Sequence, residues 1–256
     1  MLIAMLALAA AQVPVTLPSP PLRYRIESKT TLDQDLTSIA RGKVTGGMAT
    51  TAFISVTMTD SAEGQVARVM VDSLKMEPTG AMALQLTPNA AAAAADSARG
   101  AWVHAYSVRG TLRGVPQPSS PNPALASVLQ AVGVMFPGIR SGIKVGDNWA
   151  DTTKIDGDVQ GNHQLGNIIA TWTVTGTENG GLILDGTAIT KVTTTGQNGQ
   201  TLTVAGSSRE HLAMAARGPS RNASIESSRD ATTVRRPGAA PIPEKTTAVL
   251  RLTQLP

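Results

Sequence analysis

Three histidines, His104, His163 and His211, are the residues best suited to acid–base or metal chemistry in this chain. A catalytic zinc ion needs three protein ligands, and the known zinc motifs place two of them a few residues apart. Here the histidines lie far apart in the sequence, and the chain contains no cysteine. We therefore expect no metal site and no cofactor.

Covalent catalysis has no recognisable motif either. The sequence lacks a Gly-x-Ser-x-Gly elbow and a glycine-rich phosphate loop. The sequence does not exclude a Ser–His–Asp triad, because the members of a triad come together only in the folded chain. A glycosidase needs two opposed carboxylates, and no motif selects a pair from the 18 acidic residues. We name no catalytic residue and predict a protein that is not an enzyme; a polymer hydrolase is the least unlikely enzymatic class.

Several polar and glycine-rich segments are typical of turns. Asp156-Gly157-Asp158 resembles a fragment of a calcium loop but lacks the further oxygen ligands, so a polar turn is the better interpretation. Gly46-Gly47 and Gly180-Gly181 also indicate turns.

Strands must position most of these residues. Ile54, Val56 and Met58 alternate with serine and threonine, a period of two that indicates half-buried strands. Asn-Gly turn signals make residues 165–206 a series of hairpins, and residues 248–252 form a final strand. The expected fold is mainly β, with curved antiparallel sheets in a half-barrel or a two-half arrangement.

One apolar helix is predicted at about residues 123–136. Asn122 is a good N-cap, Pro123 suits the first helical position, and Pro137 follows the end. No charged residue lies between Ala124 and Phe136, whereas a surface helix usually turns charges outward. Two alternatives remain: an ordinary helix packed on a sheet, or a helix enclosed by a curved sheet. The apolar positions that would then contact a ligand are Leu125, Val128, Leu129, Val132 and Met135.

The chain divides by composition into five segments. Residues 1–11 are apolar and end in small residues, as in a signal peptide that lacks its basic start. A proline-rich linker, 12–21, precedes an N-terminal β half, 22–115. A linker with the helix, 116–138, leads to a C-terminal β half, 139–256. The leader predicts a periplasmic or secreted protein. Ala90 to Ala95 is expected to be a loop or a short helical insertion.

The charge and composition of the chain limit the classes of partner that it could bind. The net charge is +4, but the basic residues are dispersed, and aromatic residues make up 3% of the chain. Single-stranded nucleic acids need stacking aromatics as well as basic residues, so we expect no nucleic-acid partner. After the leader, no stretch is long and apolar enough to span a membrane, and we expect no transmembrane span.

The most distinctive motif is Val145-Gly146-Asp147-Asn148-Trp149, which follows Phe136-Pro137. Gly146 and Asp147 predict a tight turn, with Asp147 accepting backbone hydrogen bonds and Trp149 anchoring the next strand. The alternative is a binding pair of Asp147 and Trp149. Together with Ile242-Pro243 before the last strand, the motif resembles uncharacterised exported bacterial proteins of the DUF6263-like family. That resemblance implies no catalytic residues.

These features favour an exported, non-enzymatic protein of the bacterial cell envelope. An uncharged helix beside amphipathic strands resembles the LolA-like half-barrel carriers, which implies a lipid or another apolar ligand. The alternative is a structural or interaction protein of the envelope with a protein partner and no small ligand. A solid core beneath the helix would favour the second hypothesis.

Overall fold

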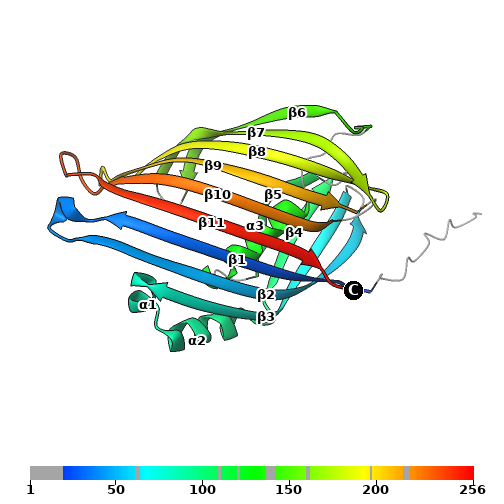
Figure 1. Ribbon diagram of the computed structural model, residues 1–256, viewed down its shortest axis with the longest axis horizontal. Coiled ribbons are helices and arrows are strands. Elements are labelled where there is room, and N and C mark those ends of the chain that lie inside the picture. Colours follow the sequence, from blue (N-terminus) through cyan, green and yellow to red (C-terminus); the bar gives the residue numbers. More distant parts are fainter. Residues whose placement is uncertain are drawn as a thin grey trace, which may run out of the picture.

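The computed structural model describes residues 20–61, 64–108, 111–119, 122–136, 142–159, 162–196, 198–215 and 219–256. The predicted leader, most of the proline-rich linker and Pro137 lie outside the described residues. Eleven antiparallel strands form one sheet (Figure 1). Their bounds are β1 (Leu22–Asp35), β2 (Lys43–Ser61), β3 (Gly64–Gly80), β4 (Trp102–Val108), β5 (Thr111–Pro118), β6 (Asn148–Val159), β7 (Asn162–Glu178), β8 (Gly181–Thr195), β9 (Thr201–Met214), β10 (Ser220–Val234) and β11 (Ile242–Gln254).

The helical segments are short. They are the 3-10 turns η1 (Thr37–Ile39) and η2 (Pro123–Leu125) and the α-helices α1 (Ala81–Gln85), α2 (Pro88–Ala98) and α3 (Ala126–Met135). The predicted helix at 123–136 is confirmed, with a 3-10 first turn. Asn122 accepts a hydrogen bond from the Ala124 amide at 2.9 Å, so it caps that turn. No helix among the described residues has the length and apolar composition needed to cross a bilayer.

The strand order is β5-β4-β3-β2-β1-β11-β10-β9-β8-β7-β6. The N-terminal strands and the C-terminal strands are two meanders, which meet where β1 pairs with β11 from Tyr24↔Gln254 to Gln34↔Glu244. The two β halves are therefore parts of a single sheet. Its edges, β5 and β6, are consecutive in the chain, and the segment that joins them contains α3.

The mainly β prediction is confirmed, and the sheet curves without closing into a barrel. Helix α3 contacts the edge strand β5 and also β1, β10 and β11. Because β5 and β10 are six positions apart in the strand order, the sheet must curl around α3 to bring both against it. Bulges assist the bend, including those at Phe53/Ile54 and Val174/Gly176. Of the two predicted arrangements, the structure thus has the one in which the curved sheet encloses the helix.

Hairpin turns follow the sequence signals in the C-terminal meander. Asn179 and Gly180 have φ of 48° and 76° between β7 and β8. Two successive positive φ values match a type I′ turn, which suits the twist of the flanking strands. The predicted series of hairpins at 165–206 is confirmed in β7, β8 and β9.

Two turn predictions are wrong. Gly46 and Gly47 lie inside β2, because other backbone approaches them: a Cβ on Gly46 would lie 2.8 Å from the Met82 nitrogen of α1, and one on Gly47 would lie 2.9 Å from the Thr30 carbonyl oxygen. Asp156-Gly157-Asp158 lies inside β6, where every residue pairs with β7. The alanine run at 90–95 belongs to α2, capped by the Thr87 hydroxyl.

Candidate functional site

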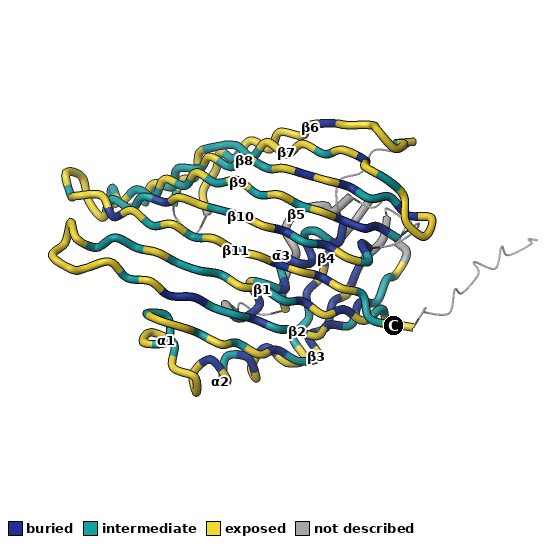
Figure 2. Tube along the Cα trace, viewed as in Figure 1, coloured by how far each residue is buried: buried dark blue, intermediate teal, exposed yellow. Residues whose placement is uncertain are grey.

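The inner face of the sheet, defined as the face that packs against α3, has two unlike parts. Figure 2 shows buried residues gathered around α3 at the end of the sheet that holds the C-terminus, and intermediate burial toward the opposite turns. In β1 the inward side chains change from Tyr24 and Ile26, both fully buried, to Ser28, Thr30 and Leu32, which are half-buried. Each inward row continues across the neighbouring strands by the antiparallel register.

The closed part is an aliphatic core around α3. Four of the five predicted ligand-contact positions, Leu125, Val128, Val132 and Met135, have no exposed surface, and Leu129 is half-buried. They pack against inward residues of both meanders, such as Ile54 and Leu252. The Ser220 hydroxyl donates to the Val134 carbonyl at 3.2 Å and holds the end of α3. Four of these helix residues therefore belong to the core, and Leu129 packs at its edge.

The open part is a surface that we call the trough. Most of its inward side chains are half-buried, and they mix aliphatic residues with hydroxyl-bearing residues. From the row of Ser28 to the row of Gln34 the floor is six residues long, or about 20 Å at the usual rise of a strand. Its aliphatic and hydroxyl-bearing side chains include Ser28, Thr30, Leu32, Ile168, Ala170, Ala188, Thr190, Val192, Val204, Ser208, Ser227, Thr246 and Ala248, and the charged Arg229 faces inward in the row of Leu32.

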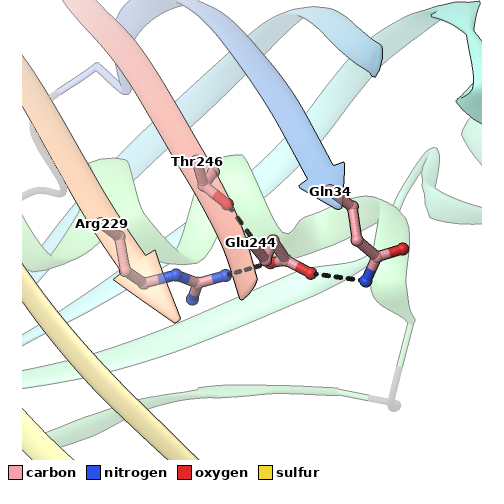
Figure 3. Close-up of polar contacts among 4 residues, drawn as sticks. All are labelled: Gln34, Arg229, Glu244 and Thr246. Atoms are coloured by element: carbon pink, nitrogen blue, oxygen red, sulfur yellow. Dashed lines mark hydrogen bonds and ion pairs between the residues drawn. The ribbon is translucent and has the colours of Figure 1, made fainter. Parts of the chain in front are cut away.

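A polar cluster lies near the outer end of the trough. In Figure 3 the Glu244 carboxylate of β11 lies between Arg229 of β10 and Gln34 of β1. Gln34 Nε2 donates to Glu244 Oε2 at 3.3 Å, and Arg229 is 3.5 Å from Oε1. Thr246 also donates to Oε1 at 3.4 Å. The Glu244 side chain is 23% exposed, so its charge is offset by three donors from three strands.

A hollow of about 440 Å³ adjoins this cluster, where the β1–β2 hairpin and the β10–β11 hairpin diverge. We call it the notch. Its walls combine inward aliphatic groups, Val44 and Ala231, with charged groups of the outer face, among them Asp33, Lys43 and Lys245. The notch gives the trough an opening at the end of the molecule opposite the C-terminus.

Glu210 marks the border between the two parts. It lies opposite Ile225 and next to Gly186 in the register of β9 with its neighbours. Burial raises the pKa of the Glu210 carboxyl, although the Ser208 hydroxyl donates to it at 3.2 Å. Glu210 is half-buried, so the inner border of the trough is less open to water than the outer face.

The predicted turn at Gly146 and Asp147 is present. Lys144 donates its amide to Asp147 Oδ2 at 2.8 Å, and Gly146 has a φ of 92°. Trp149 then enters β6, 7% exposed, and its ring lies 6.5 Å from that of Trp172. Asp147 is exposed and Trp149 is buried on the inner face, as expected of an anchoring tryptophan; a binding role for the two stays a prediction.

The histidines do not meet. His211 Nδ1 lies 2.6 Å from Asp185 Oδ1 on the outer face, and this hydrogen bond lowers the pKa of Asp185. His163 is near Asp156 and Asp158, at 3.6 Å and 3.2 Å, also on the outer face. In the part of the chain that the structure describes, no three acidic or histidine side chains are grouped to hold a metal ion.

No sequence motif indicated the residues of the trough or of the polar cluster. Gln34 and Glu244 are 210 residues apart, and only the pairing of β1 with β11 brings them together. No protein-family model matches the sequence, and a search of curated proteins finds no relative. The resemblance to DUF6263-like proteins therefore stays a prediction that rests on its short motifs.

Proposed function

We propose that this chain is an exported, non-enzymatic protein of the cell envelope that binds an amphiphilic lipid in the trough. The observation that carries the proposal is the split inner face, which is closed and aliphatic around α3 and half-open beyond it. Aliphatic side chains such as Leu32, Ile168 and Ala170, which lie between the polar cluster and the closed part, would contact hydrocarbon. The hydroxyl groups between them can donate to ester or headgroup oxygens.

The mixture of aliphatic and hydroxyl-bearing side chains on the floor explains why an amphiphile fits better than a wholly apolar or a wholly polar molecule. Ligand sites are mostly apolar concave surfaces with a few placed polar groups. Here Glu244, Arg229 and Gln34 provide charge near the notch, while the Glu210 border is less open to water. A ligand with its headgroup near the notch and its chain toward α3 would match this gradient.

A blocking substitution tests the site. Ala188→Trp places an indole on the floor of the trough, whereas Ile189→Trp places one on the outer face, where Ile189 is 60% exposed. We expect native mass spectrometry to detect lipid bound to the natively purified protein and to Ile189→Trp, and much less bound to Ala188→Trp. Equal lipid retention by both variants, with normal thermal unfolding, would refute binding in the trough.

A structural or interaction protein is the second candidate, and one observation favours it. Leu125, Val128, Val132 and Met135 are all fully buried, as in a packed core. A solid core of this kind needs no ligand. If the natively purified protein carries no lipid and no acyl amphiphile shifts its melting temperature, while a specific envelope protein co-purifies with it, this second function replaces the first.

A further inference from the structure

Two neighbouring turns form the end of the molecule beyond the notch. They are the β1–β2 turn, residues 36–42, and the β10–β11 turn, residues 235–241. The Ser38 hydroxyl donates to the Pro241 carbonyl at 3.1 Å and ties them together. We call this surface the tip; it is opposite the C-terminal end of the sheet in Figure 1.

The tip carries unbalanced positive charge. Arg41, Arg235 and Arg236 are exposed, and neither turn contains an acidic residue. The carboxylates behind the tip have cationic neighbours across the strands: Asp33 and Asp230 both lie opposite Lys245. Asp35 similarly lies opposite Lys43, and Glu244 contacts Arg229. These four carboxylates face three cations, so together with the three arginines of the turns this end of the molecule carries a net charge of +2.

Exposed aliphatic side chains accompany these arginines. Ile39 in the β1–β2 turn is 36% exposed. Leu84 of α1 is 86% exposed, and α1 begins directly after Gly80, which pairs with Gly46 near the start of β2. A surface that combines arginines with aliphatic groups fits an anionic bilayer, where the cations meet headgroups and the aliphatic groups enter the interface. A soluble polyanion would use only the charges.

We propose that the tip docks on an anionic lipid bilayer, with Arg41, Arg235 and Arg236 among the headgroups and Ile39 in the interface. Each basic residue near an anionic surface strengthens binding by roughly a factor of five, so loss of all three weakens it roughly 100-fold. Docking at the tip does not depend on ligand binding in the trough. It would, however, bring the notch close to the bilayer.

The test compares two variants of the full chain that lose the same charge. One is Arg41→Gln/Arg235→Gln/Arg236→Gln; the control is Lys29→Gln/Lys144→Gln/Lys154→Gln, at exposed positions away from the tip. Co-sedimentation is measured with vesicles of phosphatidylglycerol and phosphatidylcholine, and with phosphatidylcholine alone. We expect binding only to anionic vesicles, roughly 100-fold weaker for the tip variant and much less affected in the control. Equal losses in both variants would overturn the proposal.

Ile39→Ser separates a bilayer from a polyanion. We expect this variant to bind anionic vesicles several-fold more weakly while its affinity for heparin stays unchanged. If vesicle binding is also unchanged, the tip recognises charge alone and the bilayer proposal fails. Because these comparisons are between variants of the tip, which lies outside the trough, they remain informative whether or not the protein carries lipid.

Discussion

Leu125→Ala tests whether the residues around α3 fill a real core. Leu125 has no exposed surface, whereas Leu84 is 86% exposed, so Leu84→Ala is a control with the same chemical change. Truncating a fully buried leucine costs about 2–5 kcal/mol, because the transfer energy is lost and a cavity remains. Truncating an exposed one changes the free energy of unfolding by about 0.5 kcal/mol or less.

For a chain of this size, each kcal/mol corresponds to about 2–4 °C in melting temperature. We therefore expect Leu125→Ala to melt roughly 4–20 °C below the parent protein, and Leu84→Ala within about 2 °C of it. Differential scanning calorimetry and urea denaturation measure both changes. Leu129→Ala should fall between them, since Leu129 is half-buried.

A charge introduced on α3 tests the burial of this helix more severely. Val132→Asp puts a carboxylate at a fully buried position, and Gln130→Asp puts one at an exposed position two residues away. Burying an unpaired ion costs several kcal/mol, so Val132→Asp should unfold or lose most of its stability while Gln130→Asp should not. Similar melting temperatures for the two aspartate variants, or for the two alanine variants, would refute the enclosed helix.

Two further predictions concern single carboxylates. Burial raises the folded-state pKa of Glu210, so ionisation of this carboxyl opposes folding. The Glu210→Gln variant should therefore have a higher melting temperature than the parent protein at pH 7, and this gain should disappear below pH 4.5. A difference in melting temperature that does not change with pH, measured by calorimetry, would contradict this prediction. Asp147→Ala should lose the 2.8 Å hydrogen bond from the Lys144 amide and lower the free energy of unfolding by about 1 kcal/mol, whereas Asp147→Asn keeps an acceptor. Equal urea midpoints for the two variants would show that this hydrogen bond does not stabilise the turn.

Local signals in the sequence predicted the local structure well. Asn179 and Gly180 supply the two positive φ values of a type I′ turn, and these two adjacent residue types are enough to predict it. The uncharged segment at 123–136 predicted a helix that must be covered, and the helix is indeed fully buried on one side. In both cases the deciding residues lie within a few positions of one another.

Long-range contacts could not be predicted in the same way. Gly46 and Gly47 are in a strand because α1 and Thr30 approach their backbone, which no local pattern indicates. Asp156 and Asp158 looked like a turn because strands that are exposed on one face tolerate charges there. The trough exists only because β1 pairs with β11, which joins the first described strand to the last.

Fluorescence quenching gives the most direct test of ligand binding in the trough. Trp149 and Trp172 stack at its inner border, and Trp102 packs with Arg68 elsewhere. In a Trp102→Phe background, we predict saturable quenching by an amphiphile brominated near the end of its acyl chain, abolished by Ala188→Trp after correction for the added indole. Absence of quenching, or equal quenching when Ile189→Trp replaces Ala188→Trp, would contradict binding in the trough.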